Sequence, residues 1–384
     1  MATGSLIKGY KMRLFATIVV LFFMGNALAQ PKLMNYRVWS DFKPERVGDL
    51  YIRIENSNFF DNYEYSSPHA VGQTLIGAWG RIMGEYYFNE QLKMQVGVNG
   101  LKYTGRETFS NISEWFSVEY RPYPKLHLLL GNIDYYSVLG LPEPMYDPTL
   151  FSIKPINRGL QIAFFDRYAD AKLWLDWEQF IVQGDIFQEI FTAGISTEIK
   201  LNDSISNWGI IFPIHMLGRH HGGEIDNAGN SIESLMNYSF GVKSYFWIHD
   251  VKLVSSVSLL MFNDITKSYR QPFIKGSALY VKSMALYKNL QFGGLYWTSD
   301  NYFAPHGHPI YQSYTSLKPS QWFEKQKIIA IQSDYHINIG KAAKLFIEAD
   351  VWYDLKHKKN NFSTGLKLII MEDFFVRKIK KQNP

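Results

Sequence analysis

The feature that most constrains the fold is a two-residue alternation of apolar and polar side chains. In "KIIAIQSDYHINI", residues 327–339, Ile329 and Ile331 fall on one face, and Gln332 and Asp334 fall on the other. The segment "KLFIEADVWYDL", residues 344–355, repeats this pattern. Because successive side chains of a strand point to opposite faces, each segment predicts a strand with one apolar and one charged side. The chain has no sustained helical periodicity, so an all-β fold is predicted.

Similar runs recur along the chain and are long. Most have roughly 10–15 residues, whereas strands of globular proteins have about 5–6 and transmembrane strands need about 9–11. They are long enough to cross a membrane. The predicted strands are 48–59, 73–87, 91–104, 112–121, 125–137, 158–167, 170–182, 189–201, 206–218, 234–247, 250–262, 276–287, 290–300, 327–339, 342–355 and 361–375.

Short and long connections alternate between these strands. Tight turns are predicted at 88–91, 121–125, 166–170, 248–251, 287–290 and 338–341, with a slightly longer one at 202–206, and longer connections at 138–157, 219–233, 263–275 and 301–326. Short periplasmic turns and long extracellular loops are typical of a transmembrane antiparallel up-and-down β-barrel. Pairing strands through the turns and adding one at each end predicts about sixteen strands, with 14 or 18 as alternatives. A soluble β-sandwich or a β-helix is the rival fold.

The N-terminal segment has the layout of a secretory signal. A basic flank precedes the apolar run Leu14–Met24, and Ala27-Leu28-Ala29 stands before Gln30. We therefore predict a cleaved signal at 1–29, a periplasmic segment at 30–47, the barrel at 48–375 and a basic tail at 376–384. This organisation implies Sec-type export through the periplasm to the bacterial outer membrane.

The composition excludes several kinds of partner and site. The chain contains no cysteine, so it has no disulfides and no thiolate metal ligands. Loss of the predicted signal removes Lys8, Lys11 and Arg13 and leaves a net charge of about +2. That charge is too small to indicate a nucleic-acid partner.

The polar faces of the predicted strands indicate a wet lumen. The predicted lumen wall carries both signs of charge, on Arg53, Glu55, Arg81, Lys93, Lys172, Asp176, Glu178, His215, Arg219, Lys243, Lys282, Asp334, His336, Glu348, Asp350 and Lys367. With its signal peptide, cysteine-free mature chain and alternating strands, residues 48–375 resemble the general outer-membrane porins in architecture. The resemblance implies that the third long loop folds inward. Its acids Glu143 and Asp147 would then form a constriction opposite Arg53, Arg81 and Lys93. The alternative is a rigid surface cap or a partner surface.

The stretch "GRHHGGEID", residues 218–226, is the clearest candidate for local chemistry. His220, Glu224 and Asp226 offer ligands for a divalent cation, and a polar loop at the barrel rim is the alternative reading. No catalytic motif is found. The material for a rim-located hydrolase would be these residues with His221, Asp300, His306 and His308.

These observations favour a porin-like channel for passive diffusion of small hydrophilic solutes, without enzymatic activity. The expected surroundings are outer-membrane lipid and lipopolysaccharide, with a homo-oligomer or other outer-membrane subunits as possible partners. The only expected cofactor is a possible loop-bound cation. The first alternative is a non-conducting barrel subunit of a larger assembly, secretion or uptake complex. The second is the rim-located hydrolase.

Overall fold

The computed structural model describes residues 42–133, 140–154, 156–202, 206–223, 225–268, 270–315 and 320–379. Within these residues, no helix has the length and apolar character needed to cross a membrane. The predicted signal at 1–29 and most of the predicted tail lie outside the described residues.

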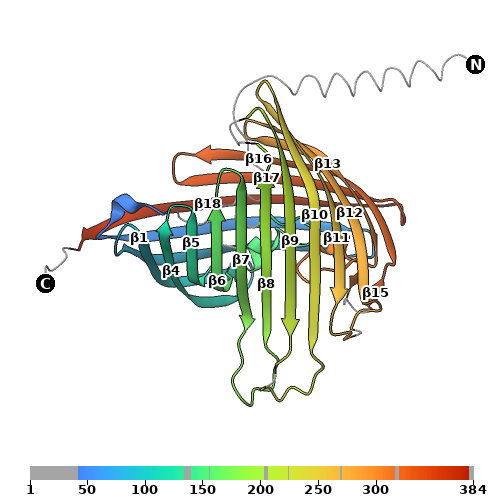
Figure 1. Ribbon diagram of the computed structural model, residues 1–384, viewed down its shortest axis with the longest axis horizontal. Coiled ribbons are helices and arrows are strands. Elements are labelled where there is room, and N and C mark those ends of the chain that lie inside the picture. Colours follow the sequence, from blue (N-terminus) through green and yellow to red (C-terminus); the bar gives the residue numbers. More distant parts are fainter. Residues whose placement is uncertain are drawn as a thin grey trace, which may run out of the picture.

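Sixteen antiparallel strands form a closed barrel, as the sequence predicts (Figure 1). Each wall strand pairs with its neighbours along the chain, except that β13 pairs directly with β16 across a long loop and β1 pairs with β18. The wall strands are β1 (Asp49–Tyr65), β2 (Gln73–Tyr87), β3 (Leu92–Tyr103), β4 (Asn111–Tyr123), β5 (Leu126–Asn132), β6 (Arg158–Phe165), β7 (Ala169–Gln179), β8 (Ile190–Lys200), β9 (Trp208–His221), β10 (Glu233–Ile248), β11 (Val251–Asp264), β12 (Lys275–Tyr287), β13 (Leu290–Asp300), β16 (Lys325–Ile339), β17 (Ala343–Asp354) and β18 (Lys359–Lys378).

The first and last strands close the barrel. β1 pairs with β18 from Asp49↔Lys378 to Tyr65↔Asn361, with one register shift near Leu50. β18 continues through Lys378, so the first three residues of the predicted basic tail belong to the wall. Closure leaves no sheet edge unpaired, which a strand-built protein needs in a membrane.

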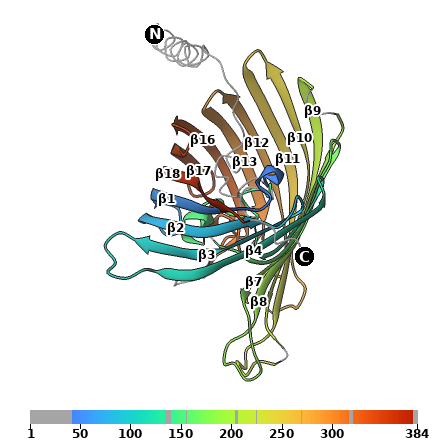
Figure 2. The same ribbon diagram turned by 90° about the vertical axis from the view of Figure 1, so that its left-hand side faces the viewer.

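The alternation sorts side chains between the membrane and the interior. On β16, Ile329 and Ile331 face outward and are 43% and 54% exposed, whereas the inward Ile328 and Gln332 are buried. Outward apolar and inward mixed faces are the reverse of a soluble protein and match a barrel in a bilayer. The end with the long loops is therefore taken as extracellular, and Figure 2 shows the connection between β7 and β8 projecting beyond the wall at that end.

Two extracellular loops fold into the barrel. The first, described at 140–154 and 156–157, carries the short helix α3 (Leu150–Ile153), and Ser152 of α3 donates a hydrogen bond to Asp61 on the wall at 2.8 Å. The second, described at 301–315 and 320–324, contains η2 (Pro309–Tyr311) and the paired strands β14 (Tyr314–Thr315) and β15 (Gln321–Trp322). Both are anchored by contacts with the wall and with each other.

Main-chain hydrogen bonds join the two loops. The Asp147 amide donates to the His306 carbonyl at 2.6 Å, and the His308 amide donates to the Glu143 carbonyl at 3.0 Å. Gly307 packs so closely that a Cβ there would lie 2.0 Å from the Pro144 carbonyl oxygen. The loops therefore form one body inside the barrel.

That body carries a large apolar core. Met145 from the first loop and Tyr302, Ile310 and Tyr311 from the second have no exposed surface. They pack with inward wall residues such as Trp297. The described loop residues thus fill much of the cross-section that a barrel of this size would otherwise leave to water.

We expect the purified protein to show no stable open steps in planar bilayers, because the packed loops obstruct the lumen. Replacing 303–315 by a short Gly-Ser linker should produce steps and serves as the positive control. Conductance of the unmodified protein at the level of an open sixteen-strand barrel would contradict this prediction.

Residues 42–48, before β1, pack against the periplasmic end of the wall. η1 (Pro44–Arg46) leads into the wall, and Phe42 packs edge-on against Tyr87 with ring centroids 5.3 Å apart. The Arg121 guanidinium lies 4.6 Å from the centre of the Phe42 ring. The described part of the predicted periplasmic segment is therefore docked on the barrel.

Candidate functional site

The turn between β17 and β18 places a carboxylate and an imidazole in contact at the extracellular rim. Asp354 ends β17, and its Oδ1 accepts hydrogen bonds from the amides of Lys356 and His357, both at 2.9 Å. Lys358 has φ 55°, which reverses the chain into β18. The tight turn brings His357 Nδ1 to 2.6 Å from Asp354 Oδ2.

A second histidine reaches the same oxygen from the connection between β1 and β2. His69 is buried, and its Nε2 lies 2.7 Å from Asp354 Oδ2. The His69 and His357 rings meet edge-on with centroids 5.3 Å apart. Asp354 thus bridges two histidines that are far apart in the sequence.

Gln326 determines which nitrogen of His69 carries the hydrogen. Its Oε1 accepts from Trp297 Nε1 at 3.3 Å and Ser299 Oγ at 3.1 Å, so its Nε2 is the donor side. That Nε2 donates to the Gln312 carbonyl and to His69 Nδ1. His69 Nδ1 is therefore an acceptor, and in the neutral ring Nε2–H donates to Asp354.

This arrangement suits a hydrogen-bonded His–Asp–His group. The ligand atoms of His69, Asp354 and His357 are close enough to surround a cation. Metal binding through His69 Nε2 would, however, require the hydrogen on Nδ1, where the Gln326 amide already donates. These donors fit a proton-handling group better than a metal centre.

The electrostatics keep Asp354 ionised. Burial alone would raise its pKa, but hydrogen bonds from His69 and from the backbone and side chain of His357 outweigh burial and hold that pKa well below the usual range. Asp354 is the last residue of β17, at its extracellular end. The amide of the next residue, Leu355, donates to the carbonyl of Lys327, an outward lysine, so Asp354 lies outside the apolar part of the membrane. With Nδ1–H of His357 directed at Asp354, Nε2 of His357 is the basic nitrogen, and the side chain is 30% exposed.

A pocket of about 540 Å³ opens beside this group on the extracellular side. It is lined by residues of both inward loops and by the ends of β1 and β2, including His69, Asp147, Thr149, His306 and His308. His306 Nε2 lies 2.8 Å from Glu178 Oε1, and Thr192 Oγ1 donates to the same oxygen at 2.6 Å. Lys154 and Arg219 also lie near Glu178, so this second pair belongs to an ionic network that anchors the loop to the wall.

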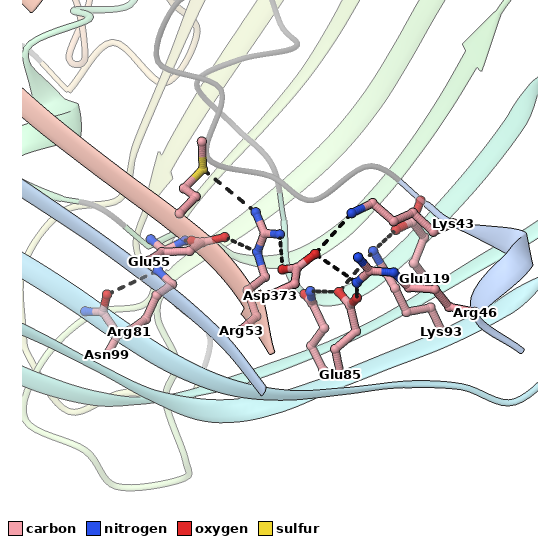
Figure 3. A network of polar contacts seen from close by, with 12 residues as sticks. Lys43, Arg46, Arg53, Glu55, Arg81, Glu85, Lys93, Asn99, Glu119 and Asp373 are labelled. Carbon is pink, nitrogen blue, oxygen red and sulfur yellow. Dashed lines mark hydrogen bonds and ion pairs between the residues drawn. The ribbon is translucent and has the colours of Figure 1, made fainter. Parts of the chain in front are cut away.

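The periplasmic half of the lumen holds a dense network of charges (Figure 3). Arg53 binds Glu55 and Asp373 at 2.6 and 2.7 Å, and Arg81 binds Glu55 at 3.1 Å. Lys93 lies 2.9 Å from Glu119. Lys43 and Arg46 of the N-terminal segment also bind Asp373, so the network fastens that segment to the wall.

The structure does not bring the predicted constriction residues together. Glu143 binds Lys282 and accepts from Gln332 Nε2 at 3.1 Å, and Asp147 Oδ1 accepts from the Thr149 amide at 2.8 Å. The three predicted opposing bases are in the periplasmic network instead. The remaining predicted lumen-wall residues lie on inward strand faces: Lys172, Asp176, Glu178, His215, Arg219, Lys243, Lys282, Asp334, His336, Glu348, Asp350 and Lys367.

The predicted cation site is only partly described. Glu224 lies outside the described residues. His220 Nδ1 lies 2.8 Å from Ser234 Oγ, and Asp226 Oδ1 accepts from the Ala228 amide at 2.9 Å. Cation binding there stays a prediction.

Sequence reasoning did not select His69, Asp354 or His357 as site residues. One local signal was present: Asp354 and His357 stand three residues apart in a polar turn, the spacing at which a carboxylate can cap the turn and bind the ring. No local signal connects His69 to them.

Comparison with known proteins places the chain in context. Residues 42–379 match the protein-family model described as lipid A 3'-O-deacylase-type. No curated protein sequence matches the chain. Similar solved structures include the outer membrane protein OprD from Pseudomonas aeruginosa, with 8% identity, a TM-score of 0.50, and coverage of 86% of this chain and 95% of that chain. OccAB3 from Acinetobacter baumannii has 10% identity, a TM-score of 0.48 and coverage of 85% and 100%.

The two kinds of match carry different conclusions. At such low identities the structural likeness shows the fold alone, a porin-like outer-membrane barrel, which confirms the predicted architecture. The family match covers nearly all the described residues and names a deacylase type. The prediction that the protein is not an enzyme is therefore wrong, because the matched family is one of enzymes.

Proposed function

Because the chain belongs to the lipid A 3'-O-deacylase-type family, we propose that it hydrolyses an ester-linked acyl chain of a lipid A-type glycolipid at its extracellular rim. The observation that carries the proposal is the Asp354–His357 pair, with Nδ1 and Oδ2 2.6 Å apart at that rim. Asp354 holds His357 in the tautomer that a general base requires.

The position of the pair suits a substrate in the outer leaflet. The glycolipid's acyl chains lie in the membrane and its sugars at the surface, so its ester carbonyls lie near the headgroup boundary. The turn that carries His357 is at the extracellular end of the wall, and its first residue, Leu355, donates its amide hydrogen to the carbonyl of Lys327 on β16. His357 is partly exposed there, whereas the Glu178–His306 pair is enclosed in the lumen.

The reaction follows from the orientation of His357. Its Nε2 accepts a proton from a water molecule as the water oxygen attacks the ester carbonyl carbon. The tetrahedral intermediate then collapses, the bond between the acyl carbon and the sugar oxygen breaks, and the imidazolium returns its proton to that oxygen. The products are a fatty acid and a sugar hydroxyl, and Asp354 stabilises the transient imidazolium.

The packed interior makes passive diffusion the less favoured function. The two inward loops bury aromatic side chains in the lumen, and their contacts with the wall do not depend on a partner protein. In an enzyme that acts on a membrane lipid, the packed inward loops would position the proposed site. The Gln312 carbonyl of the second loop accepts from Gln326, and Gln326 in turn contacts His69, which contacts Asp354.

The proposal is tested by incubating the purified full-length protein with hexa-acylated lipid A in mixed micelles. Mass spectrometry should show loss of one ester-linked acyl chain and an equal amount of free fatty acid. Divalent cations should be both added and chelated in parallel samples. Intact lipid A in all samples, from protein that is folded by its electrophoretic mobility, would overturn the proposal.

A further inference from the structure

The outer wall beside the proposed catalytic turn carries a groove with two lysines along one side. The groove has a volume of about 500 Å³ and runs over β11, β12, β13 and β16. Small outward side chains, Ser277 and Thr298, form its floor. Leu259 and Met261 border one side, and Lys325 and Lys327 stand on the other.

The groove arises because small side chains stand at outward positions where the rest of the wall carries large ones. Outward positions along most of the wall carry large apolar side chains, and Leu259 and Met261 are 60% and 44% exposed. Ser277 and Thr298 replace such a side chain at one outward position on each of the two middle strands, whereas Leu279 keeps one at the next outward position of β12. A depression flanked by apolar groups on a membrane-facing wall is matched in shape and polarity to an acyl chain.

The lysines are placed at headgroup level. On β16, Lys325 and Lys327 face outward directly above Ile329 and Ile331, which face the apolar part of the membrane. The side chain of Lys325 is 65% exposed and lies 4.0 Å from Asp300, at the limit of an ion pair. Asp300 also lines the groove, and within the described part of the chain no carboxylate lies within ion-pair distance of Lys327, so the two lysines and one carboxylate give this side of the groove a net positive charge.

The groove is joined to the proposed catalytic turn. The Leu355 amide donates to the Lys327 carbonyl at 2.9 Å, and Lys356 Nζ donates to the Lys325 carbonyl at 3.2 Å. A molecule seated between the lysines and the groove floor therefore lies on the outer face of the wall below the β17–β18 turn, and it reaches His357 over the rim, because Asp354 itself faces the lumen.

We propose that this groove binds a phosphorylated lipid of the outer leaflet, with a phosphate between Lys325 and Lys327 and an acyl chain along Ser277 and Thr298. The inference rests on the proposed function in taking this lipid as the substrate. It goes further by assigning the residues that recognise the phosphate and by locating the binding surface on the outside of the wall, not in the lumen.

The test measures binding separately from hydrolysis. The full-length protein with His357→Asn is placed in nanodiscs, and native mass spectrometry follows its binding of bisphosphorylated lipid A and of the same lipid without phosphates. Because a lysine near a membrane surface contributes about 1 kcal/mol with an anionic lipid, Lys325→Gln with Lys327→Gln should weaken binding of the phosphorylated lipid by about tenfold or more. Binding of the lipid without phosphates should not change.

Two further variants complete the test. Lys341→Gln with Lys344→Gln removes two exposed lysines at the periplasmic end and should leave binding unchanged. Thr298→Trp fills the groove and should weaken binding of both lipids. Unchanged binding in the Lys325 and Lys327 variant, or an equal loss in the periplasmic control, would overturn the groove. If the unmodified protein binds the phosphorylated lipid through these lysines but releases no fatty acid, the groove stands and the hydrolase proposal fails.

Discussion

Replacing His357 by Asn is expected to reduce acyl release by about 10²–10⁴-fold, the usual contribution of a general base. Asn lacks a nitrogen that can take up a proton, but it is close to histidine in size and can still donate to Asp354. The turn and the barrel should therefore remain intact. Initial rates of fatty-acid release from lipid A, measured by mass spectrometry for folded protein, provide the check.

Asp354→Asn should also lower the rate of acyl release, because it removes the Oδ2 atom that accepts from His357. The Oδ1 of Asn would still accept from the amides of Lys356 and His357, which preserves the turn. The NH₂ group that replaces Oδ2 cannot accept from His357 or His69, so His357 loses the partner that sets its tautomer. A loss of rate with an unchanged melting temperature would separate this role from a structural one.

His249→Asn is the matched control. His249 is exposed in a periplasmic turn with φ 52°, a conformation that Asn tolerates well. Its hydrolysis rate should equal that of the unmodified protein. If His357→Asn and Asp354→Asn also keep the full rate, the base lies elsewhere in the molecule and the assignment of this pair is wrong.

The barrel was predictable because the alternation of apolar and polar residues can be seen within each strand separately. The alternation around Ile329 and Ile331 defines one strand and its outward face, and the observed β16 extends the prediction by only two residues at its start. The short and long connections then define the strand count. These signals depend on neighbours in the sequence, since a membrane requires the same alternation in every strand.

The prediction was less complete where pairing with a distant strand decides the length of a strand. The strand predicted at 48–59 continues to Tyr65, because residues 60–65 pair with residues 361–366 of β18. Of the strand predicted at 125–137, the described part forms β5 up to Asn132, and residues 134–137 lie outside the described residues.

The site was less predictable because it depends on barrel closure. His69 and Asp354 are 285 residues apart in the sequence, and Gln326 is 257 residues from His69. They meet only because β1 pairs with β18, which pairs with β17. The predicted bases Arg53, Arg81 and Lys93 are instead paired with acids of the wall, Glu55, Asp373 and Glu119, and Glu143 is paired with Lys282.

The closure seam also contains the charge whose loss should destabilise the barrel most. Lys367 of β18 is buried in the lumen and binds Asp61 of β1 at 3.1 Å and Glu348 of β17 at 2.7 Å. It therefore links three consecutive strands of the wall. Asp61 also accepts from Ser152 of α3, so the same group holds the first inward loop.

Lys367→Met should lower the free energy of unfolding by about 3–5 kcal/mol, the usual loss when one partner of a buried ion pair is removed. Met fills a similar volume, so the loss comes from leaving the Asp61 and Glu348 carboxylates close together without the ammonium group. Urea unfolding in lipid vesicles measures the effect, and Lys359→Met, at the exposed start of β18, should shift the transition by less than about 0.5 kcal/mol.

A second substitution shows whether charge is the cause. Glu348→Gln combined with Lys367→Met removes one of the two like charges and should recover part of the lost stability, whereas Glu348→Gln alone should destabilise. If Lys367→Met unfolds at the same urea concentration as the unmodified protein, the ion pairs at the seam contribute nothing measurable to closure. If the double variant is no more stable than Lys367→Met, the loss comes from packing around the side chain and not from unpaired carboxylates.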